Sequence, residues 1–172
     1  MNRIVEIVDY DPGWPATFAA LRTRIGQALG DVAVRIEHVG STAIPGMPAK
    51  PIIDLDVVIA TRSELQTTID RLRPLGYHHE GDLGVPGREA FTTPPDTPPH
   101  HLYVCAVDSR QLADQLAFRD HLRTHSDTAN AYAQLKKTLA RRFGADRAAY
   151  SAAKTAFIET VLRAAASNAG PE

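Results

Sequence analysis

The sequence contains a single cysteine, Cys105, among its 172 residues. One cysteine cannot form a disulfide within the chain, and it excludes a zinc site built from several thiolates. No run of about 18 apolar residues is present, so we expect no membrane-spanning helix and no membrane partner. Residues 1–6 lack the apolar segment of a secretory signal peptide. These absences favour a cytoplasmic protein.

The chain also lacks a strong excess of charge of either sign, with 19 Lys and Arg against 20 Asp and Glu. Its pI is about 6.7, and no recognition motif is present, so we expect no nucleic-acid partner. The charges are unevenly distributed, because residues 110–163 hold ten basic and five acidic residues. This asymmetry indicates either solvated helix faces, or an acidic sheet that holds a cation beside basic helices that meet an anion.

Hydrophobic periodicity predicts the main elements of one domain. Apolar residues at helical spacing predict a helix over residues 14–29. In the first strand we expect Val32, Val34 and Ile36 on one face. Ser63 and Gln66 have the spacing of a capping box, which predicts a second helix that runs to about Arg73. The predicted strands are residues 32–39, 52–59 and 101–107.

After Ser109 the pattern becomes helical to the end of the chain. We therefore expect an α+β fold with an α/β core, in which a mixed β-sheet with flanking helices carries a helical C-terminal subdomain. We place the core in about 1–109 and the C-terminal helices in about 110–166. Residues 167–172 are expected to form a flexible tail. The sequence leaves the oligomeric state open.

Asp54 and Asp56 are the most informative pair in the chain. They lie in the apolar segment 52–59, and residues two apart in a strand face the same side. Two like charges about 6.6 Å apart in an apolar strand repel each other and lose hydration. A divalent cation would remove both costs, and a donor set of oxygens favours Mg²⁺ or Mn²⁺ over zinc. The alternative is an exposed strand end where both acids are solvated.

Gly40-Ser41 follows the strand that ends near residue 39, thirteen positions before Asp54. A Gly-Ser turn lets backbone amides and a hydroxyl approach an anion closely. By itself the dipeptide is a weak signal. A strand, Gly-Ser, and then Asp-x-Asp on a second strand resembles the signature of the nucleotidyltransferase superfamily. This resemblance implies that Gly40, Ser41 and the adjoining Thr42 hold a triphosphate while the carboxylates hold magnesium.

The segment from Ile36 to Asp56 also resembles the hallmark of the GrpB family. Segments 9–14 and 100–104 and three segments of the C-terminal helices match the same family in order, so the resemblance covers nearly the whole chain. It implies a nucleotidyltransferase-like fold. Members of the family are fused to dephospho-CoA kinase in some bacteria, which implies a role in assisting another enzyme as one alternative.

The segment from His100 to Ala106 contains no Asp or Glu, although superfamily enzymes usually place a third carboxylate near this point. Glu89 on the preceding strand is one substitute, and His101 is another. We therefore consider Asp54, Asp56, Glu89 and His101 as the candidate catalytic set. His38, next to the Gly-Ser turn, either lines the site or fills the core.

Several basic residues on successive predicted elements are candidates to bind the phosphates, although for each of them a solvated position is the simpler expectation. These residues are Lys50, Arg88, Arg119, Arg123, Lys136 and Lys154.

Two functions from different classes follow from these patterns. The first is an enzyme that binds a nucleoside triphosphate, with ATP as the expected nucleotide, and Mg²⁺, and that transfers a nucleotidyl group to a small-molecule acceptor or activates it. The second is a non-catalytic module that binds a nucleotide or a partner protein. The missing third carboxylate favours the second function, and the intact Gly-Ser and Asp-x-Asp favour the first.

Overall fold

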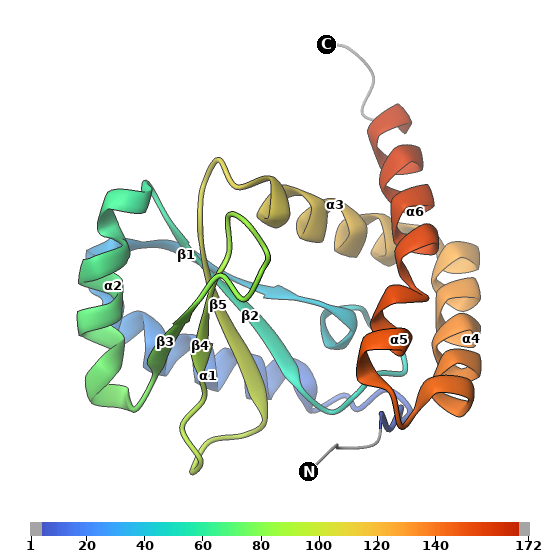
Figure 1. Cartoon of the computed structure of the whole chain (residues 1–172), viewed down its shortest axis with the longest axis horizontal. Coiled ribbons are helices and arrows are strands. Elements are labelled where there is room, and N and C mark those ends of the chain that lie inside the picture. The colour runs from blue at the N-terminus through green and yellow to red at the C-terminus, as the bar shows by residue number, and fades with distance from the viewer. Residues whose placement is uncertain (1–4, 169–172) are drawn as a thin grey trace.

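The computed structural model describes residues 5–168, and in these residues a five-stranded mixed sheet is covered by helices on both faces (Figure 1). The strands are β1 (Ala33–Val39), β2 (Ile53–Ile59), β3 (His78–Gly81), β4 (Glu89–Thr92) and β5 (His100–Ala106). The helices are α1 (Trp14–Leu29), α2 (Leu65–Leu72), α3 (Arg110–Thr124), α4 (Ser126–Phe143), α5 (Arg147–Ala152) and α6 (Thr155–Asn168).

The strand order is β1-β2-β5-β4-β3. Strands β2 and β5 are parallel, and every other neighbouring pair is antiparallel. The parallel pair lies at the middle of the sheet, and α2 lies on the long connection between its two strands. This arrangement confirms the predicted α+β class and the mixed sheet.

The predicted elements are confirmed with three corrections. Val34 is 52% exposed, because a register shift between Ala33 and Arg35 breaks the alternation that the sequence suggests. The capping box is formed by Thr61 and Glu64, two residues earlier than predicted. Helix α6 extends through Asn168, so the predicted tail begins too early, and residues 169–172 lie outside the described residues.

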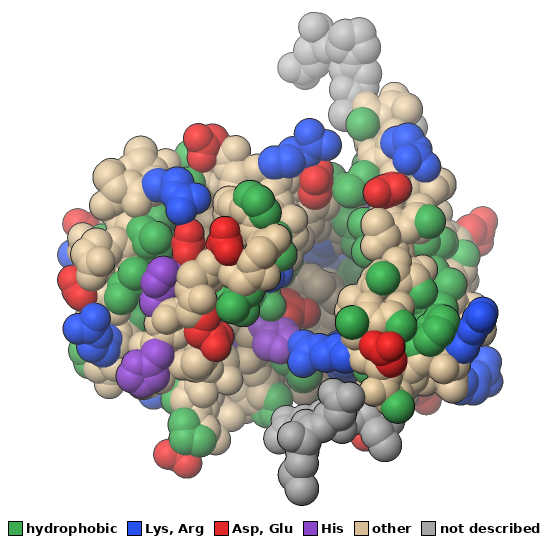
Figure 2. All heavy atoms as spheres, viewed as in Figure 1, with side chains coloured by type: hydrophobic (Ala, Val, Ile, Leu, Met, Phe, Trp, Pro, Cys, Tyr) green, Lys and Arg blue, Asp and Glu red, His purple; other side chains and the backbone are tan. Residues whose placement is uncertain are grey.

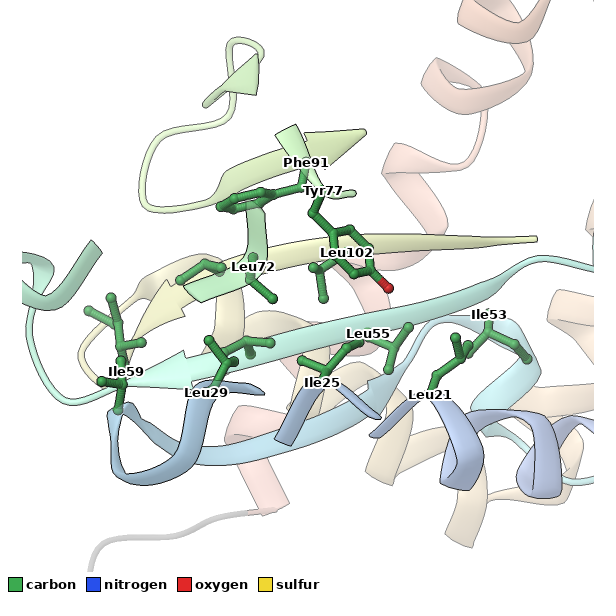
Figure 3. Packing of buried hydrophobic residues seen from close by; sticks show 14 of the residues in the cluster. Leu21, Ile25, Leu29, Ile53, Leu55, Ile59, Leu72, Tyr77, Phe91 and Leu102 are labelled. Carbon is green, nitrogen blue, oxygen red and sulfur yellow. The ribbon is translucent and has the colours of Figure 1, made fainter. Parts of the chain in front are cut away.

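One face of the sheet packs against α1 and α2 and forms the main hydrophobic core. Alternate residues of β2 point into this core, and Leu55 lies against Leu21 and Ile25 of α1 (Figure 3). Leu102 of β5 and Leu72 of α2 lie in the same cluster. Because strand side chains alternate, Asp54 and Asp56 must face the opposite side of the sheet.

Helix α3 crosses this opposite side, and α4, α5 and α6 gather beyond its end (Figure 1). Leu112 of α3 is buried with Val58 and Cys105 of the sheet, and Tyr132 of α4 is buried with Ile44 and other apolar residues that follow β1. The C-terminal helices thus form a wall that faces the edge of the sheet where β2 begins. Within the described residues, no helix is long and apolar enough to cross a bilayer.

We expect Leu55→Ala to lower the free energy of unfolding by about 3 kcal/mol, because the substitution leaves a cavity between α1 and the sheet. Leu55 is fully buried. Urea denaturation followed by circular dichroism would measure the change. Val34→Ala is the matched control and should alter stability by less than about 0.5 kcal/mol, because Val34 is exposed. Equal losses in the two variants would contradict the assigned core.

Candidate functional site

Strand pairing brings the two acids of β2 onto one face with side chains from both neighbouring strands. Asp54 pairs with Val39 of β1 and His101 of β5, and Asp56 pairs with Glu37 and Tyr103. Directly paired residues share a face, so this surface is polar where the opposite surface is a hydrophobic core. The predicted convergence of Asp54, Asp56 and His101 is therefore present.

Asp54 is half-buried and has two distinct surroundings. Its Oδ1 lies 2.8 Å from Nδ1 of His101. Its Oδ2 faces the backbone of Gly40, where an added Cβ would overlap with it. One oxygen therefore orients a histidine while the other faces the Gly-Ser turn.

Asp56 is fully buried, and neither of its carboxylate oxygens has a hydrogen-bond partner. Burial is the main cause that raises the pKa of Asp56 from 3.8 to about 7, and the charge of Asp54 adds to it. A buried carboxylate without a partner is rare and costly in a folded protein. Such a group is expected where a cation or a ligand completes the site.

The Gly-Ser turn joins β1 to a 3-10 turn, Ser41–Ala43. Gly40 has φ 71° and ψ −172°, a backbone conformation that is essentially restricted to glycine. The absence of a side chain at Gly40 allows the backbone to pass directly beside Asp54. The Thr42 hydroxyl is already engaged, 2.9 Å from Nε2 of His38.

A cleft of about 820 Å³ opens above Asp54, between the sheet and the C-terminal helices. Figure 2 shows this hollow with basic, acidic and histidine side chains along its edges. The cleft is lined by Gly40, Ser41 and Thr42 from the turn, and by Lys50, Arg88, Lys136 and Lys154. The structure thus brings together seven of the nine predicted phosphate-binding residues.

Lys136 is held by hydrogen bonds, because its Nζ donates to Oγ of Ser41 at 2.9 Å and to the carbonyl oxygen of Pro48. Burial, together with the charges of nearby Lys154 and Lys50, lowers the pKa of Lys136 to about 7. The pKa of Lys154 is lowered to about 8, again mainly by burial. Lys50 and Lys154 both lie over the ring of Tyr150. Crowded cations of this kind gain from a multivalent anion.

Glu89 is not part of this cleft, which corrects its predicted role as the third carboxylate. It pairs with Val104, whose side chain belongs to the main core, so Glu89 points to the α1 and α2 face. There its oxygens contact Arg62 at 2.8 Å and His79 at 2.7 Å. His101 remains as the predicted alternative on the correct face.

Arg119 and Arg123 are also absent from the cleft lining, because both guanidinium groups bind protein atoms instead of an open space. Arg119 contacts Glu37 and the carbonyl oxygen of His38. Arg123 donates two hydrogen bonds to the carbonyl oxygen of Ala43. The structure therefore does not bring these two predicted phosphate-binding residues into the cleft. They instead attach α3 to both sides of the Gly-Ser turn.

The histidines behave as strand alternation requires. His100 faces the main core and contacts the Tyr77 hydroxyl at 2.7 Å, whereas His101 faces the cleft. His38 stacks on Phe18 in the core, where burial lowers its pKa to about 4. His38 therefore fills the core and does not line the site.

Sequence reasoning missed three polar residues that surround the carboxylates. Glu37 lies opposite Asp56 but is tied to Arg119 and Arg35. Tyr103 carries the Arg88 guanidinium 4.1 Å above its ring. Gln115 of α3 lines the cleft with a buried, unpartnered Oε1. Strand alternation could have predicted which face of β1 carries Glu37. Placing Glu37 opposite Asp56 also required knowledge of the strand pairing.

Two carboxylates are the protein ligands available for a cation here. Among the described residues, no group of three or more Asp, Glu, His or Cys side chains is arranged to hold a metal. Mg²⁺ commonly uses one or two carboxylates and completes its shell with water and substrate phosphates. The unpartnered Asp56 carboxylate and the free oxygen of Asp54 fit that type of site and do not fit a closed structural metal site.

The fold is that of the nucleotidyltransferase-like class. It matches a Cid1 poly(U) polymerase structure with MgGTP bound at a TM-score of 0.56 and 12% identity, over 78% of this chain and 45% of that one. The chain belongs to the GrpB family, because the family model described as GrpB protein matches residues 4–164. A crystal structure of the conserved protein GrpB from Enterococcus faecalis matches at a TM-score of 0.84 and 30% identity, over 95% of this chain and 98% of that one.

Curated relatives include longer proteins. A UPF0157 protein of Pseudomonas aeruginosa is 38% identical over 92% of this chain and 66% of its own length. A protein named dephospho-CoA kinase from Mycolicibacterium paratuberculosis is 28% identical over 94% of this chain and 46% of its own length. The chain therefore spans about two thirds of the first relative and less than half of the second.

Gly40→Ala should destabilise the protein more than Gly46→Ala, by about 1–3 kcal/mol. Both glycines have positive φ, so an alanine is strained at either position. Only the Cβ at position 40 meets a neighbour, the Asp54 carboxylate, whereas the Cβ at position 46 meets open space. Thermal and urea denaturation would measure the difference. Equal losses would contradict the close approach of the turn to Asp54.

Asp56→Asn should stabilise the protein at pH 8 by about 1–3 kcal/mol in metal-free buffer and leave it nearly unchanged at about pH 3, where Asp56 is protonated in both states. The folded state raises the pKa of Asp56 to about 7, so it binds more protons than the unfolded state between about pH 4 and 7. Wild-type stability therefore falls as the pH rises through this window, and the variant lacks this slope. Urea denaturation across pH tests this, with exposed Asp96→Asn as control. If the stability of the wild type and of the variant changed with pH in the same way, Asp56 would not be a buried ionisable group.

Proposed function

We propose that this protein binds a nucleoside triphosphate with Mg²⁺ in the cleft and transfers a nucleotidyl group to a small-molecule acceptor. One observation carries the proposal. A fully buried carboxylate without a hydrogen-bond partner, Asp56, lies two residues from Asp54 on the same face of β2, and Asp54 lines a cleft with four basic side chains. A buried carboxylate without a hydrogen-bond partner and lysines that crowd one another are both stabilised by the same ligand, a metal-bound polyphosphate.

The residues of the chain have distinct roles in this proposal. Ser41 and the amides of the turn lie against the phosphates, where Gly40 allows close approach. Lys136 already holds the Ser41 hydroxyl and, with Lys50 and Lys154, opposes the negative charge of the polyphosphate. Asp54 and Asp56 would hold Mg²⁺, which when bound supplies positive charge to the phosphoryl group under attack.

His101 is the candidate proton acceptor. Its Nδ1 faces Oδ1 of Asp54, an arrangement in which Nδ1 carries the proton and Nε2 is free to accept one from an acceptor group. A carboxylate that fixes the tautomer of a histidine is a common element of general-base catalysis. The absence of Glu89 from the cleft makes His101 the one remaining member of the predicted pair.

The fold gives this proposal general support. Cid1 structures with TM-scores of 0.56 are described with MgATP or MgGTP bound. At about 10% identity that likeness concerns the fold, so the preference for ATP stays a prediction for this chain. The proposal also requires a compartment that supplies nucleoside triphosphates, which is consistent with the expected cytoplasmic location.

A second function is a non-catalytic module that binds a nucleotide or a partner and assists another enzyme. Two observations favour it. On the cleft side of β5 the residue opposite Asp56 is Tyr103, so this strand supplies no third carboxylate. In addition, relatives named dephospho-CoA kinase match this chain over less than half of their own length. A domain that accompanies a kinase in one chain is suited to an assisting role.

Mg²⁺ and ATP together should raise the melting temperature, and Asp54→Asn should remove the Mg²⁺-dependent part of this shift. Lys136→Met should weaken ATP binding by about tenfold, because it removes a buried charged donor beside Ser41. Lys137→Met is the matched control, because Lys137 is exposed and pairs with Asp9. Differential scanning fluorimetry and calorimetry would measure these effects.

A pyrophosphate-release assay with pooled acceptors separates the two functions. Turnover that is lost in Asp54→Asn supports the transferase. Nucleotide binding without turnover supports the assisting module. If no nucleoside triphosphate stabilises the wild-type protein with or without Mg²⁺, both nucleotide-based proposals are wrong.

A further inference from the structure

The order of the strands gives the cleft two chemically different sides. The Gly-Ser turn lies at the end of β1, the carboxylates lie on β2, and His101 and Tyr103 lie on β5 beyond them. In phosphoryl transfer the attacking and leaving oxygens are roughly in line on opposite sides of the phosphorus. If the pyrophosphate leaves on the side of the turn, which rests on the proposed function, the acceptor approaches from the β5 side.

Arg88 lies on this β5 side. Its guanidinium group stacks 4.1 Å above the ring of Tyr103, and it influences the carboxylate of Asp56 directly. The Nε of Arg88 is buried and has no hydrogen-bond partner. A guanidinium edge with a free Nε is half of the fork that binds a carboxylate through two parallel hydrogen bonds.

Gln115 of α3 lines the same cleft, and it has an acceptor without a partner where Arg88 has a donor without one. Its Oε1 is buried and accepts no hydrogen bond. An unpartnered acceptor of this kind requires a donor such as an ammonium group. Asp114, the preceding residue on α3, also lines the cleft and adds negative charge, although Arg110 contacts it at 2.9 Å.

Arg88 and Gln115 line the same cleft. Among the described residues, every buried side-chain polar atom without a partner belongs to Asp56, Arg88 or Gln115. Native proteins contain few such atoms, and each one calls for an explanation. The lysines of the cleft have other neighbours, because Lys136 contacts Ser41 while Lys50 and Lys154 lie over the ring of Tyr150. The Arg88 side is therefore built for a ligand group other than the triphosphate.

We infer that Arg88, Tyr103 and Gln115 form the acceptor subsite, and that this subsite takes a small amino acid or a similar zwitterion. The carboxylate of the ligand binds the Arg88 fork, and its ammonium group donates to Oε1 of Gln115. A phosphate monoester fits less well, because Arg88 is a single cation that lies close to Asp56. Arg88 then binds the acceptor and not the phosphates, for which the sequence predicted it.

Binding can be measured on the whole protein loaded with Mg²⁺ and a non-hydrolysable triphosphate. A panel of free amino acids should bind, whereas lactate, which lacks the ammonium group, and ethanolamine, which lacks the carboxylate, should bind at least about tenfold more weakly. Arg88→Met should weaken amino-acid binding by about tenfold or more and change the affinity for Mg²⁺ and the triphosphate by less than about twofold. Gln115→Leu should act in the same direction, and Gln115→Glu should preserve binding.

Arg62→Met is the matched control, because Arg62 lies on the opposite face of the sheet and contacts Glu89. Melting temperatures of all variants would show that they are folded. If Arg88→Met weakened triphosphate binding as much as amino-acid binding, Arg88 would be a phosphate ligand and the inference would be overturned. Failure of every amino acid to bind the loaded protein, or equal binding of ethanolamine, would overturn it as well. Failure of the triphosphate itself to bind would instead contradict the proposed function, and amino-acid binding to the unloaded protein would then decide the subsite separately.

Discussion

The buried carboxylate of Asp56 is the constraint on which the rest of this site depends. The protein places an ionisable group in the most apolar strand of its sheet and gives neither oxygen a partner. Burial alone makes the charged form unfavourable, and the second carboxylate on the same face adds repulsion. A fold that only needed to be stable would have an apolar residue at this position, as it has at Val58 two residues later. A cation bound beside Asp56, as we propose, would offset the free energy that this arrangement costs.

The surrounding elements hold this unfavourable pair in a fixed geometry. Alternate residues of β2 lock one face of the strand into the core with α1, so the strand cannot rotate its acids toward solvent. On the other face, Arg119 and Arg123 of α3 bind carbonyl oxygens on both sides of the Gly-Ser turn. The C-terminal helices are thus attached to the same turn that passes beside Asp54. Core packing and arginine clamps together keep the turn, the carboxylates and the lysines in one rigid frame.

Local patterns were sufficient for part of this arrangement. The periodicity of residues 14–29 gave α1 with its bounds, and the Asp-x-Asp spacing on an apolar strand gave two carboxylates on one face. The face of the sheet to which each residue of β4 points, however, is set by pairing with a strand that is distant in the sequence. Glu89 is an acid on a strand next to β5, but its parity directs it to the core side, where Arg62 and His79 neutralise it. No pattern within residues 88–92 distinguishes the two faces.

The partners of the arginines could not be predicted from the sequence either. A positive charge predicts that a side chain contacts an acceptor, but it does not say which one. Arg119 and Lys136 are equally plausible phosphate ligands in the sequence. Arg119 lies within reach of Glu37 and a free carbonyl oxygen, so its donors are consumed. Lys136 reaches Ser41 itself, and it is crowded by other cations. A cation that is satisfied by the protein stabilises the frame, whereas cations that destabilise one another are relieved by a bound anion. That difference separates the structural arginines of this fold from the lysines of its cleft.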